Sequence, residues 1–299
     1  MKINKLNEDF GLDGIVKFEE KNGHLIFLTV SNPYADAEIC LYGAHVTSFK
    51  PHYSKEVLWM SAASAFEVGK PIRGGIPVCF PWFGPHKTDS EKPQHGFARL
   101  MYWEVTETAT TPAGATSIRL QLCTSEATKA FWPHNFCIEL NIVVGTTLQV
   151  SLKVDNSGDQ TFEYTCALHS YYNVSDIENI AIMGLHSALY HSQLEPGEFI
   201  QEEKAITITK AETRHYHKTE ATCILEDSGF DRKIRIAKSG SHITTVWNPG
   251  AATCAAIGDL PDNGYHSFVC VEAVNAFDDV VTLEPKESHT TMVIMGIEK

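Results

Sequence analysis

Residues 136–155 read FCIELNIVVGTTLQVSLKVD. They contain two short β-rich runs, 136–144 and 147–155, which meet at the turn residues Gly145 and Thr146. Runs of this kind, bounded by turn residues, are typical of strands. Similar runs recur along the chain, at 24–30, 117–123, 161–169, 205–209, 243–247, 268–274 and 289–297. Many strands at such short spacing predict a sandwich or a barrel.

Amphipathic helical patterns are scarce, because the segments 61–67 and 126–131 offer at most a turn or two each. A parallel α/β sheet is therefore disfavoured, and we predict an all-β, antiparallel architecture. No linker, low-complexity tract or repeat of fixed period divides the 299 residues. The simplest interpretation is one domain over residues 1–299.

The most unusual segment is RGGIPVCFPWFGP, residues 73–85, which combines glycine, proline and aromatic residues. Because proline cannot donate to a strand ladder, this segment is not expected to form a regular central strand. Its composition is equally compatible with a wall of a ligand site and with a rigid structural crossover.

The charge balance restricts the partners. With 37 acidic and 24 basic residues, the chain has a formal charge of −13 at pH 7. This field repels polyanions, so nucleic acid is not an expected partner. An anionic ligand would have to be held by a few arginines, of which the chain has six: Arg73, Arg99, Arg119, Arg214, Arg232 and Arg235.

Cysteine usage and the start of the chain predict the compartment. The eight cysteines are widely spread, without a CxxC pair, and are predicted to be reduced core residues: Cys40, Cys79, Cys123, Cys137, Cys166, Cys223, Cys254 and Cys270. The first residues lack the apolar segment of a signal peptide, and no run approaches the roughly 18 apolar residues that a membrane span needs. We expect a cytoplasmic monomer with no membrane partner.

Two residues in strand-like runs are candidates for proton transfer. His169 ends the run TFEYTCALH on its face of small and polar side chains, where a merely hydrogen-bonded histidine is the favoured interpretation from this strand alone. Glu272 lies in FVCVEAV between apolar neighbours, and burial would raise its pKa toward that of a general base. A salt bridge is the alternative, but no local cation supports it.

A third group lies in PQHGFAR, where Gln94, His95 and Arg99 occur together. With Arg73, Arg99 could bind a phosphate through the planar guanidinium fork, and Gln94 and His95 could bond sugar hydroxyls. Either arginine alone is more often a surface residue.

Metal and nucleotide sites have no support in the sequence. His215 and His217 would share a strand face, but alternation supplies no third ligand, so surface histidines are the better interpretation. HExxH, P-loop, GxGxxG and GxSxG motifs are absent from the sequence. We therefore expect neither a metal nor an organic cofactor.

Four blocks taken together carry a resemblance: RGGIPVCFPWFG from residue 73, PQHGFAR from 93, ALHSYY from 167 and VCVEA from 269. In this order they resemble the glucose-6-phosphate 1-epimerases of the aldose 1-epimerase superfamily, over nearly the whole chain. The resemblance implies a galactose mutarotase-like supersandwich, in which two large antiparallel sheets pack face to face and one carries an open sugar site.

The resemblance also implies residue roles. It places the catalytic histidine at His169 and the catalytic carboxylate at Glu272, and the substrate-binding residues at Arg73, Gln94 and Arg99. His95 matches the same motif and is expected to face the sugar.

There is one departure from the family pattern. The family usually has an aspartate in the stretch AETRHY, where this chain has Thr213. A hydroxyl cannot replace that charge, and Glu212 or another acid is a possible substitute.

The implied reaction interconverts the α and β anomers of a hexose 6-phosphate, with glucose 6-phosphate as the leading candidate. Glu272 would take the proton of the anomeric hydroxyl and protonated His169 would give one to the ring oxygen, from opposite sides of the sugar ring. Two alternatives stay open: an aldose 1-epimerase acting on neutral hexoses, and a non-catalytic sugar-binding protein on the same scaffold.

Overall fold

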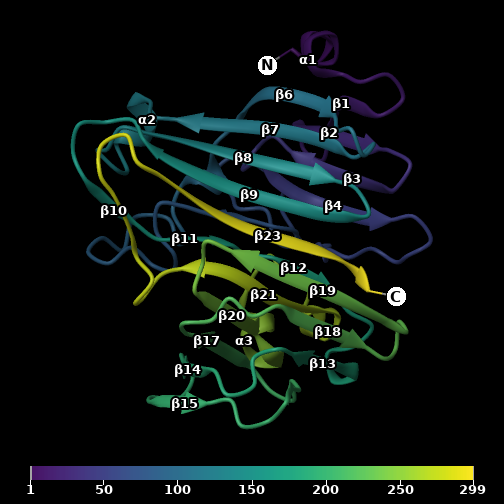
Figure 1. Cartoon of the computed structure of the whole chain (residues 1–299), viewed down its shortest axis with the longest axis vertical. Helices are drawn as coiled ribbons and strands as arrows, with labels where there is room; N and C mark the ends of the chain where they lie inside the picture. Colours follow the sequence, from purple (N-terminus) through teal and green to yellow (C-terminus); the bar gives the residue numbers. More distant parts are fainter. Residues whose placement is uncertain (1, 299) are drawn as a thin grey trace.

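The computed structural model describes residues 2–298, which form mostly antiparallel strands with a few short helices (Figure 1). The α-helices are α1 (Ile3–Phe10), α2 (Glu126–Lys129) and α3 (Gly250–Ala256). Three single 3₁₀ turns accompany them: η1 (Ala98–Leu100), η2 (Ile177–Asn179) and η3 (Gly264–Ser267).

The larger of two extended sheets has nine strands in the order β16-β13-β18-β19-β23-β9-β8-β7-β6. Its strands are β6 (Glu104–Thr110), β7 (Thr116–Cys123), β8 (Phe136–Val144), β9 (Thr147–Asn156), β13 (Ile180–Met183), β16 (Ala205–Ile206), β18 (Cys223–Asp227), β19 (Arg232–Ser239) and β23 (Ser288–Glu298). The hairpin of β8 and β9 lies in the interior of this sheet. Fully buried and partly exposed residues alternate along both strands, so one face of the hairpin is buried.

The second extended sheet follows the order β15-β14-β17-β20-β21-β11-β5, and β12 also pairs with β21. Its strands are β5 (Val78–Cys79), β11 (Cys166–Leu168), β12 (Tyr171–Asn173), β14 (Leu189–Ser192), β15 (Glu198–Ile200), β17 (Glu212–Tyr216), β20 (Ile243–Asn248) and β21 (Phe268–Asn275). Strand β21 lies between neighbours on both edges, and all of its residues are buried.

Two smaller sheets complete the structure. The four-stranded one is β1 (Val16–Lys21), β2 (Leu25–Ser31), β3 (Ala35–Cys40) and β4 (His45–Pro51), and the two-stranded one is β10 (Phe162–Tyr164) with β22 (Val281–Leu283). The four-stranded sheet lies with α1 at one end of the molecule, and β14 and β15 lie at the other (Figure 1). Every strand pairing in the described chain is antiparallel.

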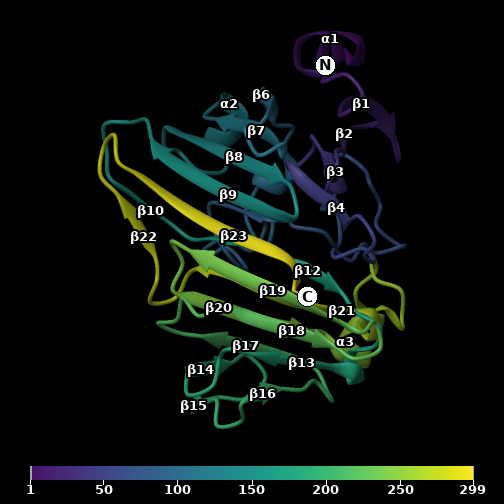
Figure 2. The same ribbon diagram turned by 45° about the vertical axis from the view of Figure 1, so that its right-hand side comes forward.

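The two extended sheets pack face to face, with β19 and β23 next to β20 and β21 (Figure 2). Val269 and Val271 of β21 belong to the same apolar cluster as Ile236 of β19 and Val293 of β23. Because side chains alternate along a strand, Cys270 and Glu272 must point to the opposite face of the eight-stranded sheet. The predicted all-β antiparallel architecture is confirmed, and its core leaves that face free for a site.

Some sequence-based details were wrong. The run 161–169 is broken at residue 165 into β10 and β11, which join different sheets. By contrast, residues 61–67 contain one turn, at 62–63, and no helix, which is within the expected limit of a turn or two. Helices α1 and α3 were not predicted. As expected, the proline-rich segment 73–85 contributes only the two-residue edge strand β5.

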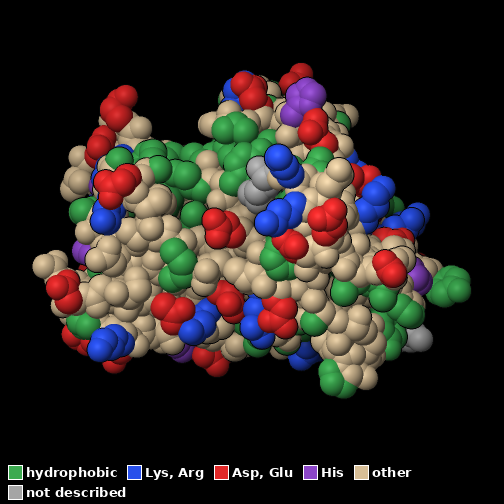
Figure 3. Space-filling model, turned by 90° about the horizontal axis from the view of Figure 1, so that it is seen from above, with side chains coloured by type: hydrophobic (Ala, Val, Ile, Leu, Met, Phe, Trp, Pro, Cys, Tyr) green, Lys and Arg blue, Asp and Glu red, His purple; other side chains and the backbone are tan. Residues whose placement is uncertain are grey.

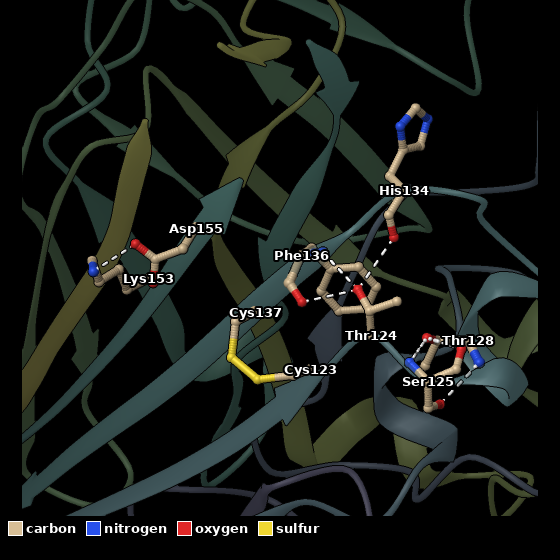
Figure 4. Close-up of a disulfide and its surroundings, with 9 residues drawn as sticks. All are labelled: Cys123, Thr124, Ser125, Thr128, His134, Phe136, Cys137, Lys153 and Asp155. Carbon is tan, nitrogen blue, oxygen red and sulfur yellow. Dashed lines mark hydrogen bonds and ion pairs between the residues drawn. A yellow bond between two sulfur atoms is a disulfide. The ribbon is translucent and has the colours of Figure 1, made fainter. Parts of the chain in front are cut away.

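Cys123 and Cys137 correct the prediction that all eight cysteines are reduced core residues. They are direct partners in the register of β7 and β8, their Cα atoms are 4.0 Å apart, and their sulfur atoms form a disulfide (Figure 4). Cys123 is exposed and Cys137 half-buried. The other six cysteines are buried and free. The pairing depends on register between strands, which the spacing of cysteines along the chain does not reveal.

Charges of both signs are interspersed on the face in Figure 3, which carries no broad basic area. No helix among residues 2–298 is long and apolar enough to span a bilayer.

The buried face of β8 generates a stability prediction. Ile142→Ala removes a fully buried side chain, so it should lower the free energy of unfolding by about 2–5 kcal/mol. Glu139→Ala, on the other face of the same strand, should change it by less than about 0.5 kcal/mol. Denaturant titration of both variants checks this, and equal losses would contradict the assignment of the two faces.

Candidate active site

A cavity of about 250 Å³ opens on the face of the eight-stranded sheet that does not pack against the nine-stranded sheet. All six residues predicted for the site line it. The lining residues are Arg73, Phe83, Gly84, Pro85, Gln94, His95, Arg99, His169, Gln193, Thr213, His215, Thr245, Trp247, Ile257 and Glu272.

The floor of the cavity is a row of side chains across three paired strands. Glu272 of β21 is opposite Thr245 of β20, which is opposite His215 of β17. Glu272 is only 2% exposed, and its Oε2 has no hydrogen-bond partner in the described chain. A buried carboxyl group with a free oxygen is costly unless something else supplies the partner.

His169 lies directly after β11, next to Glu272. Its backbone N–H donates to the carbonyl oxygen of Pro77 at 3.1 Å, and its ring stacks on Tyr171 with centroids 4.9 Å apart. The ring edge of Trp247 lies against another side. These contacts hold the imidazole in one orientation, at 7% exposure.

The two candidate proton carriers are immediate neighbours. Nδ1 of His169 is 3.5 Å from Oε1 of Glu272. No sugar ring fits between these atoms, so the expectation that they act from opposite sides of the ring is wrong. The two side chains instead lie next to each other on one side of the cavity, where they can reach neighbouring atoms of a ligand.

Burial governs the protonation of this pair. It raises the pKa of Glu272 well above its usual value, because the carboxylate loses its hydration. Burial also moves the pKa of His169 well below its usual value, and His95, Arg99 and Arg73 add to that shift. Both effects favour a protonated Glu272 and a neutral His169.

The loop from Gly84 to Gly96 forms one wall and is closed at its base. The N–H of His95 donates to the carbonyl oxygen of Gly84 at 2.7 Å, and the N–H of Gly84 donates to Nδ1 of His95 at 3.1 Å. Since Nδ1 accepts, the Nε2–H of His95 is free to donate. Gly96 is required here, because its φ is +76° and a Cβ would collide with the carbonyl oxygen of Phe80. Burial, followed by the charges of Arg99 and Arg73, lowers the pKa of His95 to about 3.

The two arginines differ in how far protein groups balance their positive charges. Nε of Arg73 is 3.0 Å from Asp259, and its Nη1 donates to the hydroxyl of Tyr171 at 3.1 Å. Arg99, 7% exposed, donates from Nη2 to the backbone carbonyl of Gln94 at 2.7 Å, while its Nε has no partner. No carboxylate of residues 2–298 forms a salt bridge with Arg99, and burial lowers the pKa of Arg99.

The end of the cavity at β17 is neutral and polar. His215 was interpreted as a surface histidine, and that interpretation is wrong: it is 1% exposed, with Nδ1 bonded to the hydroxyl of Thr245 at 2.8 Å and Nε2 without a partner. Burial, followed by the charges of His191 and His217, lowers the pKa of His215 to about 3. The apposition of β17 and β20 that buries it is not visible in the sequence.

Glu212 does not compensate for the missing aspartate at Thr213. Thr213 lines the cavity, whereas Glu212 points to the other face of β17 and pairs with Arg214 at 2.7 Å. Among the lining residues of the described chain, Glu272 is the only carboxylate.

Several lining residues were missed by sequence reasoning, notably Phe83, Gln193, Thr245 and Trp247. Phe83 lies in segment 73–85, whose composition and family resemblance were the signals for it. For metal binding, one group of residues combines suitable ligand types: His169, Cys270 and Glu272.

Comparison with known proteins identifies relatives. The sequence profile of the family described as "Aldose 1-epimerase" matches residues 27–295. A Salmonella typhimurium protein named "Putative glucose-6-phosphate 1-epimerase" is 35% identical over 271 residues, 90% of each chain.

Solved structures agree with these matches. The structure of YeaD from Salmonella typhimurium, described as a "putative mutarotase", superposes with a TM-score of 0.90 at 31% identity and covers 99% of both chains. Galactose 1-epimerase from Lactobacillus acidophilus, at 13% identity, shares the fold, with a TM-score of 0.72 over 95% of this chain and 98% of its own. The predicted galactose mutarotase-like fold is confirmed.

The raised pKa of Glu272 has a consequence for stability. Above about pH 4.5 an unfolded chain has released this proton while the folded chain still holds it, so wild type loses stability as pH rises. Glu272→Gln removes that loss. The melting temperature of the variant relative to wild type should therefore increase as the pH rises above about 4.5. Glu163→Gln, at an exposed position of β10, should show a difference that does not vary with pH; the same flat profile for Glu272→Gln would contradict the burial argument.

Proposed function

The chain belongs to the aldose 1-epimerase family, and we propose that it interconverts the α and β anomers of a hexose 6-phosphate, glucose 6-phosphate first. The relative in Salmonella typhimurium carries that substrate in its name. The cavity is lined both by two arginines, Arg73 and Arg99, and by the neighbouring His169 and Glu272.

The observation that carries the proposal is the uncompensated charge of Arg99. A buried guanidinium group without a carboxylate partner is costly, and an anionic ligand relieves that cost. Arg99 opens on the cavity, with Arg73 as a second donor whose charge is already balanced by Asp259. A phosphate bound chiefly by Arg99 and also by Arg73 satisfies these guanidinium groups.

The proposed chemistry needs one acid and one base near C1 of the sugar. Glu272 accepts the proton of the anomeric hydroxyl, and protonated His169 donates a proton to the ring oxygen, so the pyranose opens to the aldehyde. Rotation about C1–C2 and reclosure with the transfers reversed give the other anomer. Because both substrate oxygens are bonded to C1, an acid and a base that are neighbours can serve them.

Substrate binding supplies the required protonation. The positive charges of Arg99 and Arg73 contribute to the low pKa of His169, after burial and His95. A phosphate dianion offsets those charges, which favours transfer of the Glu272 proton to His169. Binding energy at the phosphate, remote from C1, thus prepares the reacting pair. Gln94 and the Nε2–H of His95 are available to sugar hydroxyls.

Two alternatives remain for testing. An aldose 1-epimerase for neutral hexoses would use His169 and Glu272 but would leave Arg99 without an anionic partner. A non-catalytic sugar-binding protein is raised by Thr213, where the family usually has an aspartate.

We also propose that the protein acts as a monomer in the cytoplasm, in carbohydrate metabolism. Phosphate esters, being charged, do not cross bilayers freely, so their conversion belongs in the compartment that makes them.

Anomer exchange followed by NMR tests the substrate class. Wild type should accelerate exchange of glucose 6-phosphate more than that of glucose. Arg99→Gln should lower kcat/KM for glucose 6-phosphate by roughly 10- to 150-fold, the value of one charge-assisted hydrogen bond. Exchange of glucose should not fall, because glucose has no phosphate and loss of the Arg99 charge favours protonation of His169. Arg235→Gln, at an exposed position of β19, should leave both unchanged. Equal acceleration of both sugars by wild type would exclude the phosphate role.

Glu272→Gln separates an enzyme from a binding protein. The amide cannot accept the anomeric proton, so turnover should fall by about 10²–10⁴-fold. Affinity for glucose 6-phosphate, measured by calorimetry, should persist because Arg99 is untouched. If wild type binds the sugar phosphate without any exchange above the spontaneous rate, the sugar-binding alternative holds instead.

A further inference from the structure

The proposed acid–base pair has a third neighbour that the reaction does not use. Cys270 precedes Glu272 by two residues on β21, so both side chains point to the cavity face of the sheet. One ligand atom from each of His169, Cys270 and Glu272 lies within 4.8 Å of the others. All three residues are buried, and within the described chain neither Nδ1 of His169 nor Oε2 of Glu272 has a hydrogen-bond partner.

We propose that His169, Cys270 and Glu272 form a binding site for Zn²⁺, and that the bound ion reversibly blocks the acid–base pair. Imidazole, thiolate and carboxylate are the ligand types that zinc binds. Ligand atoms of a tetrahedral zinc site are about 3.3–3.8 Å apart, given zinc bond lengths of about 2.0–2.3 Å. Nδ1 of His169 and Oε1 of Glu272 already have that separation, at 3.5 Å. The sulfur of Cys270 needs to approach by no more than about 1 Å.

The charges balance when zinc binds. Glu272 and Cys270 each release one proton to solvent, and the resulting carboxylate and thiolate neutralise the two charges of the ion. This balance is necessary because Arg73 and Arg99 line the same cavity and would repel an uncompensated cation. Asp259 already offsets Arg73. A neutral centre therefore adds no net charge beside Arg99.

The surroundings favour a thiophilic ion with one open position. Trp59, Tyr171 and Phe268 pack around Cys270 and close the site on that side, whereas His169 and Glu272 face the cavity. The fourth zinc position is then directed to the cavity, where water or a sugar oxygen reaches it. Mg²⁺ and Ca²⁺ require about six or more oxygen ligands and would find one carboxylate. Zinc thus fits the three ligands better than Mg²⁺ or Ca²⁺ does.

Titration of chelator-treated protein with Co²⁺, a spectroscopic substitute for zinc, tests the binding. Wild type should develop the near-ultraviolet absorption of a thiolate–cobalt bond, saturating at one ion per chain, and Zn²⁺ should displace it. Cys270→Ser should lose the band. Cys254→Ser should retain it, because Cys254 belongs to the same apolar cluster but donates to the carbonyl oxygen of Pro261 at 3.2 Å.

Glu272→Gln gives an independent check should Cys270→Ser fail to fold. It leaves the thiolate in place, so the band should persist while the affinity for Co²⁺ falls at least tenfold. Absence of the band in wild type, its retention in folded Cys270→Ser, or an unchanged affinity in Glu272→Gln would each overturn the proposal.

The predicted inhibition of anomer exchange by zinc rests on the proposed function, whereas the predicted binding of zinc does not. Equimolar Zn²⁺ should suppress anomer exchange of glucose 6-phosphate, a chelator should restore it, and Cys270→Ser should need at least tenfold more zinc for the same suppression. If zinc binds as described but exchange continues, the roles proposed for His169 and Glu272 fail and the metal site stands. If exchange is suppressed equally in Cys270→Ser, the inhibitory site is wrong.

Discussion

Burial of Glu272 on the central strand β21 is the constraint on which the site depends. A carboxyl group at 2% exposure, with one oxygen free of partners, is unfavourable for folding. The fold tolerates this cost because β21 is paired on both edges and its other face is held in the apolar core through Val269 and Val271. The same burial raises the pKa of the carboxyl group well above its usual value, which makes its carboxylate a stronger base.

The other residues of the cavity lie around Glu272 and come from elements of different rigidity. Paired strands supply Glu272, Thr245 and His215 in one row, which fixes their spacing. Arg73 comes instead from an irregular segment, where it pairs with Asp259, and Arg99 comes from the 3₁₀ turn η1, just after the loop that the Gly84–His95 bonds close. Strands thus carry the reacting carboxyl group, and loops carry the groups that select the ligand.

Local patterns predicted much of this structure. The run 136–144 forms β8 with those bounds, and the four motif blocks converge on one cavity. The features that could not be predicted depend on the register between strands that are distant in sequence. The burial of His215 depends on the pairing of β17 with β20, and the Cys123–Cys137 disulfide on the pairing of β7 with β8. The contact between His169 and Glu272 likewise depends on the pairing of β11 with β21. It cannot be predicted from the sequence of either strand alone.

The most direct test of the account is a crystal structure with a bound hexose 6-phosphate. The account predicts phosphate oxygens within hydrogen-bond distance of Arg99, the anomeric hydroxyl on Glu272 and the ring oxygen on His169. A phosphate bound outside the cavity, or a C1 atom turned away from Glu272, would contradict it.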